Sequence, residues 1–79
     1  MRAPVSKEPA MKLSARNALP GVVRNIDLGA VNAEVTLELG PGLTIVSIIT
    51  LDAVKNLSLK VGDRAYAVIK ASSVMVAVD

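Results

Sequence analysis

The segment from Val31 to Leu39 constrains the fold most, because its residues alternate strictly between apolar and polar. A period of two is typical of a strand that buries one face. Gly40-Pro41-Gly42 follows as a turn signal, and a second apolar segment runs from Leu43 to Thr50. The pattern predicts two consecutive strands joined by a tight turn.

The second of these strands is apolar on both faces. Leu43, Ile45 and Ile49 lie on one face, whereas Val46 and Ile48 lie on the other. A soluble protein rarely leaves such a surface open to water. We therefore expect one face to meet the interior of a barrel and the other to contact a neighbouring subunit.

The rest of the sequence predicts short helices and strands before and after these two strands. We expect one helix over residues 51–57, with Thr50 as its N-cap, and further strands over residues 12–18, 22–28, 64–71 and 74–78. Leu19-Pro20-Gly21 separates the first two of these strands. The expected fold class is all-β, a small OB-like barrel of five or six strands with one short helix. Residues 1–10, with two prolines and mixed charge, predict a disordered lead-in, and residues 11–79 a single domain.

Composition excludes several classes of function. The 79 residues include no cysteine and no histidine, which removes disulfides and the common zinc sites, so oligomerisation is the remaining reinforcement for so small a domain. Without those residues, the roles of general base and nucleophile would fall to carboxylates, lysine or serine, and the carboxylates show no paired or calcium-loop spacing. We therefore expect a protein that is not an enzyme.

The net charge and the hydropathy of the sequence limit the classes of partner that the protein can bind. The net charge of +2 is too small for duplex nucleic acid, and Tyr66, the single aromatic residue, cannot supply a stacking series for single strands. An OB module for single-stranded nucleic acid is nevertheless one of the alternatives. The sequence contains neither an apolar run of membrane-spanning length nor the apolar core of a signal peptide. We expect a cytoplasmic protein with no membrane partner.

Two segments near opposite ends of the sequence combine a hydroxyl with a cation and contain no carboxylate. They are Ser14-Ala15-Arg16 and Lys70-Ala71-Ser72. In a strand, residues two apart share a face, so each hydroxyl projects beside its cation. A tetrahedral oxyanion binds best where cations and neutral donors converge, and backbone N–H groups near Ala71 or at the start of the helix can add to them. The alternative is that both pairs are ordinary polar residues of an exposed strand face.

Residues 11–17, Met-Lys-Leu-Ser-Ala-Arg-Asn, resemble the start of the molbindins, which are small molybdenum-pterin-binding-type proteins. The same module, the Mop or transport-associated OB (TOBE) domain, is also appended to molybdate-responsive regulators and transporter ATPase subunits. The likeness continues, in the right order, through Leu19-Pro20-Gly21, residues 29–35, 48–50, 59–63 and 67–74.

The resemblance implies an OB-like barrel that assembles as a homohexamer, a trimer of dimers, and binds molybdate or tungstate between subunits without catalysis or a cofactor. On the matching positions, Ser14, Ala15 and Arg16 would contribute donors and Lys70 a charged ligand. The backbone around Ala71 and Ser72 would contribute as well.

The resemblance also implies contributions from elsewhere in the assembly. A neighbouring subunit would supply a donor from the start of its helix, near Thr50 and Ala53. Many members carry a serine where this chain has Ala53, so only a backbone N–H can act there. A second class of site, near the three-fold axis, would be lined by the turn that contains Asn32.

The chemistry of such a site favours a fully deprotonated dianion. A protonated oxyanion such as phosphate at neutral pH would present an O–H group to donors that cannot accept it. Molybdate and tungstate, which are nearly isosteric, satisfy this condition equally. The predicted function is storage or homeostasis of such an anion. The alternative is an anion-sensing regulatory or transporter-associated interaction module.

Overall fold

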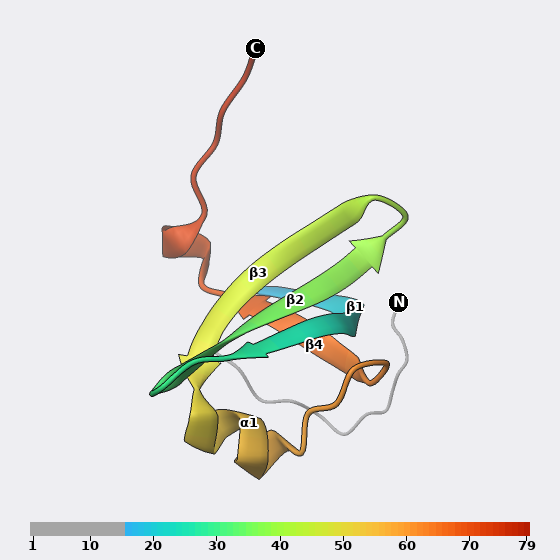
Figure 1. Cartoon of the computed structure of the whole chain (residues 1–79). Helices are drawn as coiled ribbons and strands as arrows, with labels where there is room; N and C mark the ends of the chain where they lie inside the picture. The colour runs from blue at the N-terminus through green and yellow to red at the C-terminus, as the bar shows by residue number, and fades with distance from the viewer. Residues whose placement is uncertain (1–15) are drawn as a thin grey trace.

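Four antiparallel strands form one sheet in the order β3-β2-β1-β4. The computed structural model describes residues 16–79 (Figure 1), so the lead-in and the Ser14-Ala15 positions lie outside the described residues. In chain order the elements are β1 (Asn17–Leu28), β2 (Asn32–Gly40), β3 (Leu43–Thr50), the helix α1 (Leu51–Leu57), β4 (Arg64–Ile69) and a 3-10 turn η1 (Ala71–Ser73).

The hairpin of β2 and β3 agrees with the alternating pattern. Val35 faces Ser47 and Leu37 faces Ile45 across the two strands, and Gly42 takes a positive φ of 73° in the turn between them. Ala33, Val35 and Leu37 are buried, while the polar side chains between them are not. The predicted inner face of β2 is confirmed.

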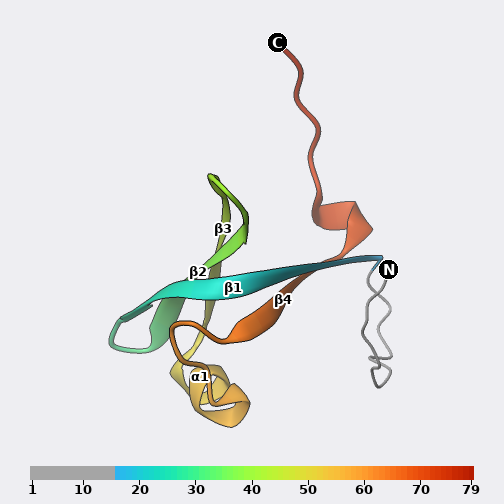
Figure 2. The ribbon, with the colours of Figure 1, turned by 90° about the vertical axis from the view of Figure 1, so that its right-hand side faces the viewer.

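β1 joins the two halves of the sheet. Its first part pairs with β4, from Asn17 opposite Ile69 to Val22 opposite Arg64. Its second part pairs with β2, beginning with Val22 opposite Glu38. The sheet curls where β1 passes from one partner to the other, so β2 and β3 stand at an angle to β4 (Figure 2). Val23 lies at this crossing and is fully buried at 0% exposure.

The predicted break at Leu19-Pro20-Gly21 is wrong, because β1 runs through all three residues as one strand. Pairing with β2 begins only at Val22, so the segment before it pairs with β4 alone. A proline, which lacks an N–H group, is tolerated in a segment with one open edge. Gly21 lets β1 approach β2 closely, since a Cβ there would lie 2.8 Å from the carbonyl oxygen of Glu38.

The strand predicted over residues 74–78 is also wrong for this structure, and the strand predicted over residues 64–71 ends at Ile69. After Ile69 the η1 turn directs the chain away from the sheet, so no strand of residues 16–79 lies beside the last segment (Figures 1 and 2). The described residues therefore contain four strands, and not five or six.

The two faces of β3 differ in exposure. Ile45 and Ile49 are half-buried and pack against the core, whereas Val46 and Ile48 are 53% and 64% exposed. Leu43, at the start of the strand, is exposed as well. The inner face is confirmed at Ile45 and Ile49, and contact of the outer face with a neighbouring subunit stays a prediction.

The helix α1 forms where the sequence predicts it. The Oγ1 atom of Thr50 caps it by accepting a hydrogen bond from the Ala53 N–H at 3.0 Å. Ser58 ends it in the left-handed conformation. In residues 16–79, the helices are all too short or too polar to cross a membrane.

The close approach of β1 and β2 at Gly21 generates a stability prediction. Gly21→Ala forces a Cβ against backbone atoms of Glu38, and we expect it to lower the free energy of unfolding by about 1–3 kcal/mol. Gly40→Ala is the matched control, since a Cβ there meets nothing within 4 Å, and it should change stability by less than about 0.5 kcal/mol. Urea unfolding at constant protein concentration measures both; equal effects would contradict the packing described here.

Candidate anion site at the β1–β4 end

The antiparallel register of β1 and β4 brings the two cations of the sequence motifs together. Asn17 faces Ile69 in the ladder, and continuing the same register by one residue places Arg16 opposite Lys70. Side chains directly opposite in an antiparallel pair have Cβ atoms about 4.5–5.5 Å apart. Both residues are exposed, so their charged groups can reach a small ligand from the same face.

Asn17 stabilises this end of the β1–β4 ladder. Its side-chain amide Nδ2 donates a hydrogen bond to the carbonyl oxygen of Ile69 at 3.3 Å. The bond links the residue after Arg16 to the residue before Lys70. This hydrogen bond joins two uncharged residues, and it therefore helps to keep the neighbouring Arg16 and Lys70 at the same end of the sheet.

The η1 turn follows Lys70 directly. The N–H of Ser73 donates to the carbonyl oxygen of Lys70 at 2.9 Å, and the N–H of Val74 donates to that of Ala71 at 3.2 Å. Within residues 16–79, the N–H groups of Ala71 and Ser72 donate to no backbone acceptor. Both residues are exposed, so the turn offers neutral donors beside the Lys70 ammonium.

Arg16 and Lys70, each one residue beyond the last pair of the β1–β4 ladder, have like charges and no ion-pair partner among residues 16–79, where the single ion pair joins Arg24 to Glu38. Like charges directly opposite in a sheet repel each other. A bound anion would relieve that repulsion and accept charge-assisted hydrogen bonds from both side chains. The arrangement is thus suited to a small anion.

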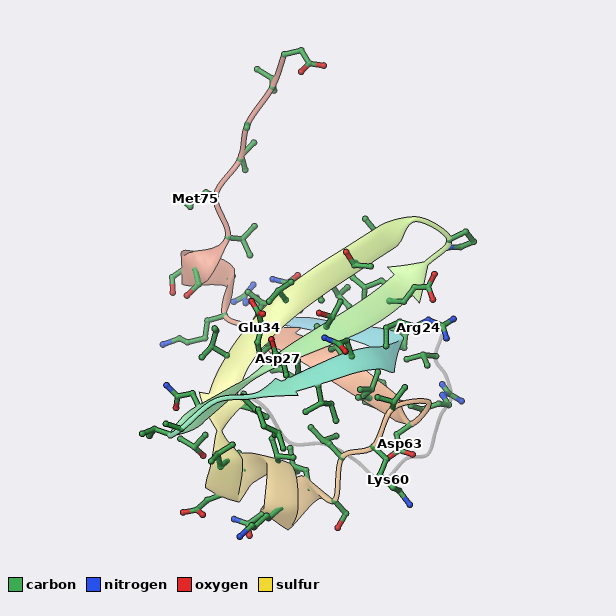
Figure 3. The ribbon with its side chains drawn as sticks, viewed as in Figure 1. Arg24, Asp27, Glu34, Lys60, Asp63 and Met75 are labelled. Atoms are coloured by element: carbon green, nitrogen blue, oxygen red, sulfur yellow. The ribbon has the colours of Figure 1, made fainter. Side chains whose placement is uncertain are left out.

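A second cluster of cations, Arg24 and Arg64, differs from Arg16 and Lys70 because it includes a carboxylate. Arg24, Arg64 and Glu38 line a shallow groove of about 410 Å³ beside the β2–β3 turn. Here the Glu38 carboxylate already pairs with Arg24 (Figure 3 labels Arg24). The sequence pattern did not indicate this groove, because the side chains that form it come from separate strands and a turn. Its internal ion pair makes it a poorer anion site than the Arg16–Lys70 end.

The positions expected from a neighbouring subunit lie at the start of α1. The N–H of Ala53 is engaged by the Thr50 hydroxyl, and the N–H of Leu51 donates to the carbonyl oxygen of Val31 at 3.1 Å. Both views show α1 well apart from η1 within one chain (Figures 1 and 2). Thr50 and Ala53 of the same copy therefore do not complete the Arg16–Lys70 site.

Asn32 lies in surroundings of the opposite charge. It lines a hollow of about 290 Å³ together with Asp27 and Glu34, which face each other directly across β1 and β2. Figure 3 shows these two carboxylates on neighbouring strands. Two carboxylates repel an oxyanion. Within one chain, this hollow is not suited to hold one.

The curled sheet with one short capped helix, and a cation pair where β1 meets the end of β4, define a small OB-like ligand-binding domain. The chain belongs to the TOBE domain family, whose model matches residues 13–76. The resemblance to the molbindins noted from the motifs is thereby confirmed, as is the OB-like fold class.

Three relatives are similar over most of the chain. A probable molybdenum-pterin-binding protein of Haemophilus influenzae is 54% identical over 69 residues, which cover 87% of this chain and 100% of that protein. The solved molybdate-binding protein of Sporomusa ovata has a TM-score of 0.80 at 37% identity, covering 85% of this chain and 98% of its own. The cytoplasmic molybdate-binding protein ModG, solved with molybdate bound, has a TM-score of 0.73 at 57% identity. This match covers 77% of this chain and 43% of ModG.

Because Arg16 and Lys70 carry like charges, their repulsion should lower the free energy of unfolding when no anion is bound. Lys70→Gln removes one of two like charges, and we expect it to raise the free energy of unfolding of the anion-free protein by about 0.2–1 kcal/mol at low salt. The gain should shrink as salt screens the repulsion.

Lys60→Gln, at an exposed turn position, is the matched control and should change stability by less than about 0.5 kcal/mol at any salt concentration. Thermal or urea unfolding at two ionic strengths measures both variants. A loss of stability in Lys70→Gln would show that the two charges do not repel each other in the anion-free protein.

Proposed function

We propose that this protein binds molybdate or tungstate as a cytoplasmic storage or homeostasis protein, through a single domain spanning residues 11–79. The observation that carries the proposal is the pair of cations Arg16 and Lys70, which flank the last pair of the β1–β4 ladder and lack a carboxylate partner among residues 16–79. Three relatives whose names include molybdenum or molybdate, one of them named as cytoplasmic, support the choice of ligand and location.

The proposed site combines charge with neutral donors. Arg16 presents a planar guanidinium that can donate two parallel hydrogen bonds to two oxygens of a tetrahedral anion. Lys70 supplies a second charge, and the N–H groups of Ala71 and Ser72 supply donors at the start of η1. Ser14 and Ala15, which lie outside the described residues, complete the set in this proposal.

The ligand is held as a fully deprotonated dianion. All the proposed groups are donors, so each oxygen of molybdate or tungstate can accept, and neither anion carries a proton at neutral pH that would need an acceptor. Two cations balance two negative charges. The proposed function therefore needs neither a cofactor nor a catalytic step.

The proposed sites lie at contacts between subunits of a homohexamer, a trimer of dimers. The exposed apolar side chains of β3, Val46 and Ile48, support burial of this face against another copy. Thr50 and Ala53, which are remote from η1 in one chain, can approach a site only from a neighbouring copy. We keep Asn32 as a proposed contributor to a second site, which would need cations from another copy to offset Asp27 and Glu34.

Removal of either cation tests the function directly. Arg16→Ala and Lys70→Ala should each weaken molybdate binding about tenfold or more, because a charge-assisted hydrogen bond contributes on the order of 1.5–3 kcal/mol. Arg64→Ala is the matched control, since Arg64 lies at the opposite end of β4, and it should bind like the parent.

Isothermal titration calorimetry with molybdate, tungstate, sulfate and phosphate measures these affinities. Binding of molybdate and tungstate in preference to phosphate is the expected result for the parent protein. If neither metal oxyanion binds, the proposed function is wrong. If both bind but the Arg16 and Lys70 variants match the parent, the function stands and the site is elsewhere.

A further inference from the structure

The η1 turn occupies its own hydrogen-bond acceptors and leaves its donors available. The carbonyl oxygens of Lys70 and Ala71 accept hydrogen bonds from the N–H groups of Ser73 and Val74. The N–H groups of Ala71 and Ser72 donate to no backbone acceptor among residues 16–79. The side chain of Lys70 makes no capping hydrogen bond to η1 within the described part of the chain. The turn therefore presents donors and a positive charge to a ligand.

One carbonyl oxygen beside the candidate anion site lies outside this turn. It belongs to Ile69, the last residue of β4, and it accepts a hydrogen bond from Nδ2 of Asn17 at 3.3 Å. A carbonyl oxygen can only accept, so the nitrogen of the Asn17 amide, and not its oxygen, faces it. Ile69 directly precedes Lys70, so an open lone pair there would be an acceptor next to a ligand charge. Asn17 thus occupies the acceptor that the bonds of η1 do not.

The same hydrogen bond fixes the orientation of the Ile69–Lys70 peptide group. The group is trans, because residues 16–79 contain no cis peptide bond, so its C=O and N–H point in opposite directions. With the C=O held toward Asn17, the N–H of Lys70 points away from Asn17. The carbonyl of Lys70 is held in turn by the first hydrogen bond of η1. The backbone of Lys70 is therefore fixed from both sides, while its side chain is exposed.

We propose that Asn17 determines the specificity of the oxyanion site, because its amide keeps the Ile69 carbonyl from accepting a hydrogen bond from the ligand. The inference rests on the proposed function, in which Arg16 and Lys70 bind a fully deprotonated dianion. Asn17 does not itself touch the anion. It is a positioning residue that acts through the Ile69–Lys70 peptide group, and with this acceptor occupied the segment from β4 to η1 presents only donors.

An open acceptor at Ile69 would change which anions bind. Molybdate, tungstate and sulfate carry no proton at neutral pH, so the partial negative charge of a free carbonyl oxygen would repel them. Phosphate at neutral pH carries an O–H group that can donate to that oxygen. Loss of the Asn17 donor should therefore weaken the binding of the fully deprotonated anions and spare phosphate. A side chain that only stabilises the fold would affect all four anions alike.

The neutral amide at position 17 suits this role better than a carboxylate of the same shape. A carboxylate at this position could not donate to the Ile69 carbonyl, because it has only acceptors when ionised. It would also lie next to Arg16 in the sequence and could form an ion pair with it in place of the ligand. An amide donates to the carbonyl and leaves the positive charge of Arg16 uncompensated.

Substitution of Asn17 tests the proposal through the ratio of two affinities. Asn17→Leu has a side chain of similar size without a donor, and we expect it to weaken molybdate binding about three- to tenfold, which corresponds to one hydrogen bond. Sulfate should weaken with molybdate, whereas phosphate should compete with molybdate at least as well as in the parent. The preference for molybdate over phosphate should thus fall about threefold or more.

Two further variants serve as rescue and control. Asn17→Gln keeps an amide donor and should retain most of the preference for molybdate over phosphate. Asn25→Leu removes an exposed asparagine of the same strand that pairs with β2 instead of β4, and it should bind all four anions like the parent. Isothermal titration calorimetry at constant ionic strength measures molybdate directly and the weaker anions by competition. If Asn17→Leu does not fold, Asn17→Ala carries the same test, because it also removes the donor.

Three results would overturn the role of Asn17. They are a donor-free variant that binds molybdate like the parent, one in which molybdate and phosphate weaken by the same factor, and one with which phosphate does not compete. The parent protein separates these failures from that of the proposed function. If the parent binds no molybdate, both proposals are wrong; if it binds molybdate and one of the three results is found, only the role of Asn17 is removed.

Discussion

The division of β1 between two partners is the constraint on which the rest of the structure depends. Its first part pairs with β4 and its second part with β2, and the change of partner at Val22 and Val23 produces both the curl and the buried centre. The same pairing aligns the residue before β1 with the residue after β4. Arg16 and Lys70 thus meet because of the register, although 53 residues of sequence lie between them.

Local patterns predicted much of this fold. The alternation at Ala33, Val35 and Leu37 predicted the buried face of β2, and Thr50 predicted the start of α1. The continuity of β1 through Pro20 was not predictable, because it depends on which edge of that segment is unpaired. The fate of residues 74–78 was not predictable either, because an apolar alternating segment becomes a strand only beside a partner.

The candidate site was likewise predictable from the sequence only in part. Residue chemistry indicated Arg16 and Lys70 as cations without neighbouring carboxylates, and strand register adds that they adjoin the paired residues Asn17 and Ile69 at one end of the sheet. The Asp27–Glu34 pair beside Asn32 could be found only from strand register, and the Arg24–Glu38 ion pair only from the positions of the side chains. Charge compensation, which sequence alone does not show, therefore distinguishes the one candidate anion site from the other polar surfaces of residues 16–79.

The central claim is that a molybdenum or tungsten oxyanion is held between Arg16 and Lys70. The most direct test is anomalous X-ray diffraction from crystals grown with molybdate, measured at the molybdenum absorption edge. The account predicts an anomalous peak within hydrogen-bonding reach of the Arg16 guanidinium, the Lys70 ammonium and the N–H groups of η1. A peak confined to the groove of Arg24 and Arg64, or no ordered peak in crystals of a protein that binds molybdate in solution, would contradict it.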